Sequence, residues 1–232
     1  MIGFYDYTVI LTYLSLLSAG TGIFVSLSGD GHPYWGTLFL LICGLCDAFD
    51  GMVARTKKDR TSLQKNFGIQ IDSLSDIIAF GVLPACIGMA VVRTSAMWED
   101  HLGFDKGNIL ITIVSVLLFA ILILYILAAL IRLAFFNATE EERQRTEGGV
   151  RKAFTGLPVT SASLIFPSVM LFRYILPVDI SILYFPVTLI TGFLFLSKLQ
   201  VPKPKLRGVL IMVGAGIIEF ALLLLFFYVF KK

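Results

Sequence analysis

Four aspartates in two short stretches are the residues of this sequence best suited to chemistry. Asp47 and Asp50 lie in D-A-F-D-G-M-V-A-R, and Asp72 and Asp76 lie in G-I-Q-I-D-S-L-S-D. On helices, spacings of i,i+3 and i,i+4 place each pair on one face of its own helix. Two such helices side by side would present four carboxylates to a single point.

These acids lie between long apolar runs, where negative charge needs compensation. A charged residue in a membrane helix costs roughly 2.5 to 3.5 kcal/mol, and neighbouring like charges repel one another. Hard divalent ions such as Mg²⁺ or Mn²⁺, bound through oxygen, would balance the charge. Two such ions about 3.5 to 4 Å apart would clamp a pyrophosphate, and a nearby carboxylate could take a proton from a hydroxyl acceptor. Interhelical ion pairs, or acids that line the pathway of a divalent-cation transporter, are the alternatives.

The residues that follow the first acid pair suit a phosphate-bearing ligand. Gly51 has no side chain, so a ligand can approach the helix backbone, and Ala54 is small. The guanidinium of Arg55, one turn further on, can bind a phosphate through two parallel hydrogen bonds.

The composition predicts an all-α polytopic membrane protein. Of the 232 residues, 57% are hydrophobic and 15% are charged, whereas soluble domains average about 25% charged residues. Apolar runs of the length that spans a bilayer form helices, because the backbone must satisfy its own hydrogen bonds in lipid. We expect one domain over residues 1–232, with runs at about 8–28, 34–55, 70–92, 108–135, 157–176, 178–197 and 208–230.

The basic residues predict the orientation. Lys and Arg are concentrated in the segments that follow the second, fourth and sixth runs. By the positive-inside rule these segments face the cytoplasm, and so does the N-terminus. The acidic stretches would then open to the cytoplasmic side of the plasma membrane.

Other residue types carry weaker signals. Cys43 and Cys46 form a C-x-x-C inside an apolar run, where small packing residues are the expected role. His32 and His101 fall in short loops far apart in the sequence and predict no histidine-based site. We expect no nucleic-acid partner.

The two acidic stretches together resemble the signature of the CDP-alcohol phosphotransferase family, D-x-x-D-G-x-x-A-R followed by G-x-x-x-D-x-x-x-D. All eight positions match, namely Asp47, Asp50, Gly51, Ala54, Arg55, Gly68, Asp72 and Asp76. The family usually has eight residues between the Arg and the next Gly, whereas this chain has twelve, residues 56–67. A polar connection tolerates four extra residues at small entropic cost. We therefore expect the second helix to end near Arg55 and the third to begin near Gly68.

This resemblance implies a six-helix core over about 8–197, often homodimeric, with an accessory span over about 208–230. It also implies a CDP-linked lipid substrate and two divalent ions. Asp47, Asp50 and Asp72 are implied as metal ligands, and Asp76 as the general base that also approaches a metal. Contacts with the cytidine diphosphate are implied at Gly51, Ala54, Arg55, Gly68 and Thr12.

Three further stretches resemble the phosphatidylserine synthase branch of this family. They read I-D-S-L-S-D-I-I-A-F-G-V-L-P-A, R-L-A-F-F-N and F-T-G-L-P-V-T-S. The resemblance implies transfer of a phosphatidyl group from CDP-diacylglycerol to the hydroxyl of L-serine, which releases CMP. Glycerol phosphate or inositol phosphate as the acceptor is the alternative within the family.

A serine acceptor would need an anchor for its carboxylate. Arg132 is the basic residue that we place well inside a span, and Asn137 follows it by about one turn. We expect both to contact serine, and Arg151 to bind an anionic acceptor or a lipid phosphate. Pairing of Arg132 with an acid, or snorkelling to the interface, is the alternative.

Overall fold

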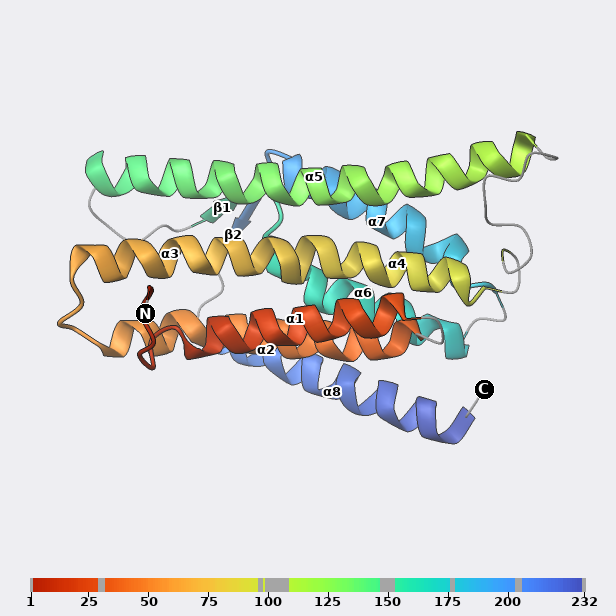
Figure 1. Cartoon of the computed structure of the whole chain (residues 1–232), viewed down its shortest axis with the longest axis horizontal. Coiled ribbons are helices and arrows are strands. Elements are labelled where there is room, and N and C mark those ends of the chain that lie inside the picture. The colour runs from red at the N-terminus through yellow and green to blue at the C-terminus, as the bar shows by residue number, and fades with distance from the viewer. Residues whose placement is uncertain are drawn as a thin grey trace.

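The computed structural model describes residues 2–28, 32–95, 98, 109–146, 153–175, 178–202 and 206–230. Figure 1 shows a bundle of long helices that lie alongside one another. The α-helices are α1 (Ile10–Leu27), α2 (Pro33–Thr56), α3 (Ser62–Asp76), α4 (Leu83–Arg93), α5 (Ile109–Thr146), α6 (Ala162–Ile175), α7 (Ser181–Leu196) and α8 (Leu206–Phe230). A π-helical segment, η1 (Ile77–Val82), joins α3 to α4, and a 3₁₀ turn, η2 (Val159–Ser161), precedes α6.

The prediction of an all-α polytopic membrane protein is confirmed. Within the described residues, five helical stretches are long and apolar enough to cross a membrane. They are Ile10–Leu27, Pro33–Thr56, Ser62–Arg93, Ile109–Arg143 and Arg207–Phe226. Shorter apolar helices cover Val159–Arg173 and Ser181–Leu196, and α6 and α7 each contain an internal proline.

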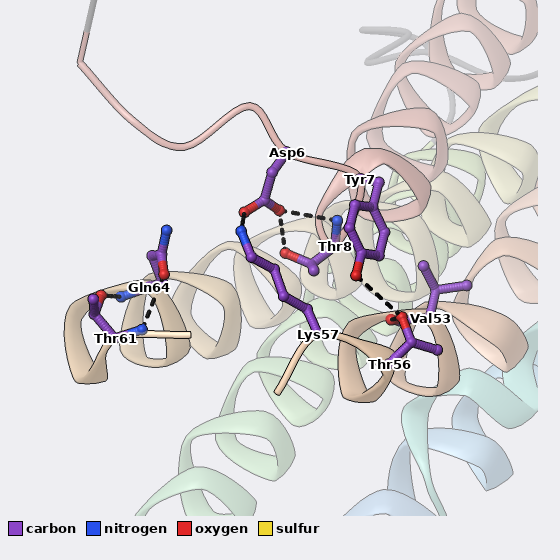
Figure 2. Close-up of polar contacts among 8 residues, drawn as sticks. All are labelled: Asp6, Tyr7, Thr8, Val53, Thr56, Lys57, Thr61 and Gln64. Carbon is purple, nitrogen blue, oxygen red and sulfur yellow. Dashed lines mark hydrogen bonds and ion pairs between the residues drawn. The ribbon is translucent and has the colours of Figure 1, made fainter. Parts of the chain in front are cut away.

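The third helix begins earlier than the sequence pattern predicted. It starts at Ser62 instead of near Gly68, because Thr61 and Gln64 form a capping box. The Gln64 amide donates to the Thr61 hydroxyl at 3.2 Å, and the Gln64 side-chain oxygen accepts from the Thr61 amide at 2.9 Å. These two bonds satisfy amides that the helix itself leaves unpaired. Residues 62–67 of the twelve-residue connection are therefore helical, and Figure 2 shows where this helix begins, beside Thr61 and Gln64.

The segment before α1 is tied to the connection between α2 and α3 (Figure 2). The Lys57 ammonium lies 2.9 Å from an Asp6 carboxylate oxygen, and Asp6 also accepts from the amide and hydroxyl of Thr8. The Thr56 hydroxyl donates to the Tyr7 hydroxyl at 3.4 Å. Because these contacts join segments about fifty positions apart, they fix where the chain enters α1 and leaves α2.

This tie predicts a small stability effect with a defined pH dependence. The Thr8 hydroxyl and the Lys57 ammonium, by hydrogen bonding, lower the pKa of Asp6 from 3.8 to about 2. Its contribution is therefore present above pH 4 and is lost as the pH falls from about 4 to about 2. We expect Asp6→Asn to lower stability by about 0.5 to 1 kcal/mol at pH 7. The difference in melting temperature between Asp6→Asn and the unsubstituted protein should disappear in acid. As a control, Asp59→Asn, in the connection between α2 and α3, should show no such difference at either pH.

Two buried tyrosines hold the continuous helix formed by α3, η1 and α4, just after Asp76. The Tyr125 hydroxyl on α5 donates to the Phe80 carbonyl of η1 at 2.6 Å. The Tyr184 hydroxyl on α7 donates to the Pro84 carbonyl of α4, also at 2.6 Å. A π-helical turn changes the helix phase and leaves carbonyls that need partners. These bonds therefore fix the rotation, about its own axis, of the helix that carries Asp72 and Asp76.

Candidate active site

Three of the four predicted acids come together where α2 and α3 face one another. Asp47 and Asp50 extend from the last turns of α2, and Asp72 extends from α3. One carboxylate oxygen from each lies within 4.8 Å of the others. The cluster is partly buried, so water screens its charge incompletely. Three oxygen ligands at this separation fit a hard divalent cation.

Asp76 lies one turn beyond Asp72, at the end of α3. It lines the same cavity as the cluster but lies outside the three-acid group. Thr12 on α1 is buried, and its hydroxyl donates to an Asp50 oxygen at 3.5 Å. The Ser75 hydroxyl donates to the Thr12 carbonyl at 3.3 Å, which joins α1 to α3. Thr12 therefore lies beside the acids, where it orients Asp50.

A cavity of about 730 Å³ contains the acids and continues into an apolar region. Along α2 its lining runs from Arg55 back to Leu41, a distance of about 21 Å at the rise of an α-helix. The acids occupy the end near Arg55, whereas Leu41, Ile42 and Leu45 line the other end. One space thus joins a polar compartment to an apolar one.

Some residues of the signature line the cavity and others do not. Gly51 and Arg55 line the cavity, and a Cβ at Gly51 would lie 3.1 Å from the Arg55 guanidinium. A side chain there would displace that guanidinium. Ala54 and Gly68 are not among the described residues that line the cavity, and a Cβ at Gly68 would lie 3.9 Å from Arg60. Their contact with a nucleotide stays a prediction.

Arg132 reaches the cavity from α5. Its side chain is buried, its Nε donates to the Leu157 carbonyl at 3.1 Å, and its guanidinium lies 5.5 Å from the centre of the Phe136 ring. These contacts hold the side chain in the cavity wall. A contact of Arg132 with serine stays a prediction.

Asn137, another predicted serine contact, forms a hydrogen bond to α3. The Asn137 amide donates to the Ser73 hydroxyl at 2.7 Å, and Asn137 is not among the described residues that line the cavity. Ser73 directly follows Asp72, so Asn137 fixes the register between α5 and α3 beside the acids. Arg151 lies outside the described residues.

A short β-ribbon at the cavity rim was not anticipated. Strand β1 (Ala153–Thr155) pairs antiparallel with β2 (Gln200–Pro202), and Phe154 lines the cavity. Gly156 follows with a φ of +78°, its amide donates to the Leu199 carbonyl at 2.7 Å, and a Cβ would lie 2.7 Å from the Phe195 carbonyl. The glycine of F-T-G-L-P was the only signal in the sequence for this close approach.

These features define a multi-spanning membrane protein with a carboxylate site at one end of an apolar cavity. The sequence model of the CDP-alcohol phosphatidyltransferase family matches residues 8–229, and the chain belongs to this family. Its members generally use divalent metals, which agrees with the acid cluster. Membership argues against the alternative of a divalent-cation transporter.

Several curated relatives are similar to this chain. An archaetidylserine synthase of Methanothermobacter thermautotrophicus is 31% identical over 191 residues, which cover 82% of this chain and 68% of that protein. A CDP-diacylglycerol–serine O-phosphatidyltransferase of Saccharomyces cerevisiae is 32% identical over 63% of this chain and 48% of its own length. One from Helicobacter pylori is 28% identical over 72% of this chain and 62% of its own length. The matched region is thus less than two thirds of the last two proteins.

Proposed function

We propose that this protein transfers the phosphatidyl group of CDP-diacylglycerol to the hydroxyl of L-serine, giving phosphatidylserine and CMP. The observation that carries the proposal is the cluster of Asp47, Asp50 and Asp72 at the polar end of a cavity that continues into an apolar region. A substrate with a charged pyrophosphate and a lipid tail matches that division. The names of the relatives, which specify serine as the acceptor, support the choice of alcohol.

The acid cluster suits the divalent metals of the family. Asp47, Asp50 and Asp72 would hold two ions, Mg²⁺ or Mn²⁺, with Asp76 as a further ligand. When bound, these ions would neutralise the pyrophosphate and stabilise charge on the attacking and leaving oxygens.

The chain's own residues would bind the phosphate and accept the proton of the acceptor hydroxyl. Arg55 binds a phosphate. Because Gly51 has no side chain, the Arg55 guanidinium has room beside it. Asp76 accepts the proton of the serine hydroxyl. The serine oxygen forms a bond to the β-phosphorus as the bond from that phosphorus to the CMP oxygen breaks, and CMP leaves with the electron pair.

Arg132 is the proposed anchor for the serine carboxylate, while Asn137 supports the site through Ser73. A direct contact of Asn137 or Arg151 with the acceptor stays part of the proposal. A buried guanidinium in a low-dielectric wall binds a carboxylate more strongly than it would in water.

Arg132→Ala is expected to raise the KM for serine by about 10- to 100-fold, because a hydrogen bond to a charged group contributes about 1.5 to 3 kcal/mol. The KM for CDP-diacylglycerol should change by less than about twofold if the arginine binds only the acceptor. The matched control is Arg173→Ala, because Arg173 also lies over an aromatic ring, 5.9 Å from the centre of Tyr34. Equal rises in both KM values would argue for a structural Arg132.

The proposed reaction is tested with purified protein, CDP-diacylglycerol and a panel of acceptors. L-serine should give CMP and a serine-containing lipid, and chelator should stop both. Faster reaction with glycerol phosphate or inositol phosphate would assign the protein to another branch of the family. Absence of CMP with every acceptor would reject the transferase.

We further propose that the chain is a single catalytic unit over 1–232, that it forms a homodimer, and that the acids face the cytoplasm at the plasma membrane. The connection between α2 and α3, beside the acids, is rich in Lys and Arg, which favours the cytoplasmic side and a cytoplasmic N-terminus. Trypsin should therefore cut this connection in inverted vesicles and spare it in right-side-out ones. The mass of the purified protein in detergent tests the dimer.

A further inference from the structure

One face of α8 borders the cavity along several turns. Val209, Val213, Gly216 and Phe220 all line it, and they are spaced i, i+4, i+7 and i+11, as expected for one helix face. The same face continues to Leu223, which is 1% exposed and belongs to the core of the bundle. The residues of α8 on the cavity side therefore form a continuous apolar stripe.

The far half of α8 is attached to the bundle. The Ser168 hydroxyl of α6 donates to a carboxylate oxygen of Glu219, and Phe220 and Leu224 pack against the core around Leu223. Figure 1 shows α8 at the edge of the bundle beside α2. Strand β2, which precedes α8 in the chain, also lines the cavity through Val201. The contacts of Glu219 and Phe220 hold the middle of α8 against α6 and the core.

The facing walls come from α2 and α6. A Cβ at Gly216 would lie 3.4 Å from a methyl of Leu164 on α6 and 3.8 Å from a methyl of Leu41 on α2. These are ordinary van der Waals separations, so a larger side chain would extend into the space that the three helices enclose. Leu41 lies nine residues before Asp50, or about 13 Å along the helix axis.

We propose that α8 forms the outer wall of a groove that binds a hydrocarbon chain of the CDP-linked lipid. This inference rests on the proposed function and adds the site for the lipid part of the substrate. The occupant is argued from continuity: one cavity contains the acids at one end and the stripe of α8 farther along. An amphiphile with its pyrophosphate at the acids would place its chain between α2, α6 and α8.

The groove also places lipid selection on a helix outside the proposed six-helix core. The names of the relatives differ in their lipid part, archaetidyl in one and CDP-diacylglycerol in others. A wall that contacts the hydrocarbon would contribute to such a preference, because it meets the part of the substrate in which these lipids differ.

The test fills the groove at Gly216 and uses Gly214 as the matched control. Gly216→Leu adds a side chain between the three helices, whereas a Cβ at Gly214 has nothing within 4 Å. Both changes replace a glycine of the same helix by leucine. Dissociation constants are measured for dioleoyl CDP-diacylglycerol, for dihexanoyl CDP-diacylglycerol and for CDP with Mg²⁺.

Gly216→Leu should weaken binding of the dioleoyl lipid about tenfold or more, the range that a few methylenes in an apolar pocket provide. In the same variant, the dissociation constants for the dihexanoyl lipid and for CDP should change by less than about twofold. In Gly214→Leu, the dissociation constants for both lipids and for CDP should all change by less than about twofold. Gly216→Ala should fall between the unsubstituted protein and Gly216→Leu.

Two results would overturn the groove: equal loss in both leucine variants, or equal loss for long and short chains. Because the measurement is binding, it needs no acceptor. A protein that makes no CMP with serine yet shows the chain-length effect would reject the proposed reaction and support the groove.

Discussion

Asp76→Asn is expected to lower kcat for serine by about 10²- to 10⁴-fold, the contribution of a general base. Asp76 lines the cavity but lies outside the group formed by Asp47, Asp50 and Asp72. The amide keeps the shape of the carboxylate and cannot take the proton of the hydroxyl. CDP binding in the presence of Mg²⁺ should persist, because the three-acid cluster is unchanged and the amide oxygen can still serve as the further metal ligand.

The measurement combines single-turnover CMP release with CDP binding in the same preparation. The control is Asp179→Asn, since Asp179 accepts from Ser95 and Ser181 near the start of α7, at the other end of the bundle. That variant should keep the original kcat. Unchanged turnover in Asp76→Asn would remove Asp76 as the base, and loss of CDP binding would reassign it as an essential metal ligand.

Asp72→Asn is expected to change stability in opposite directions with and without metal. Without metal, three carboxylates within 4.8 Å repel one another, so removing one charge should stabilise the chelated protein by about 1 to 3 kcal/mol. With metal, the same change removes a ligand from the cluster. Saturating Mg²⁺ should then no longer raise the melting temperature, whereas it should stabilise the unsubstituted protein by about 2.7 kcal/mol at a hundred times its dissociation constant.

Melting curves in detergent, with chelator and with Mg²⁺, measure both predicted changes in stability in one experiment. Turnover should be lost in Asp72→Asn, together with metal-dependent CDP binding. Asp59→Asn supplies the control, because Asp59 is an exposed acid in the connection between α2 and α3. Equal metal stabilisation in Asp72→Asn and the original chain would show that the ions do not bind this cluster.

The acid pairs could be anticipated because helical periodicity is a local property. Two acids three or four residues apart must share a face once their segment is helical, and the apolar flanks of α2 and α3 made helices necessary in lipid. The meeting of Asp72 with Asp47 and Asp50 needed only that the chain reverse its direction between α2 and α3, so that the two acid-bearing faces point toward one another. Such a reversal follows from the short connection that joins the two helices.

The start of α3 was misjudged for a local reason of another kind. Its polar composition predicts a loop, although Thr61 and Gln64 have the spacing of a capping box, and the capping box starts the helix. The position of Asn137 could not be foreseen, because its hydrogen bond to Ser73 joins residues 64 positions apart.

By itself, the sequence determined the helical membrane class and the two acid-bearing helix faces, since hydrophobicity and periodicity act along a single segment. Only the tertiary structure decided which surfaces enclose the apolar part of the cavity. That enclosure depends on α8 returning beside α2 and α6, on Leu223 entering the core, and on the pairing of β1 with β2. Such contacts depend on how distant surfaces fit, which no local pattern of residues encodes.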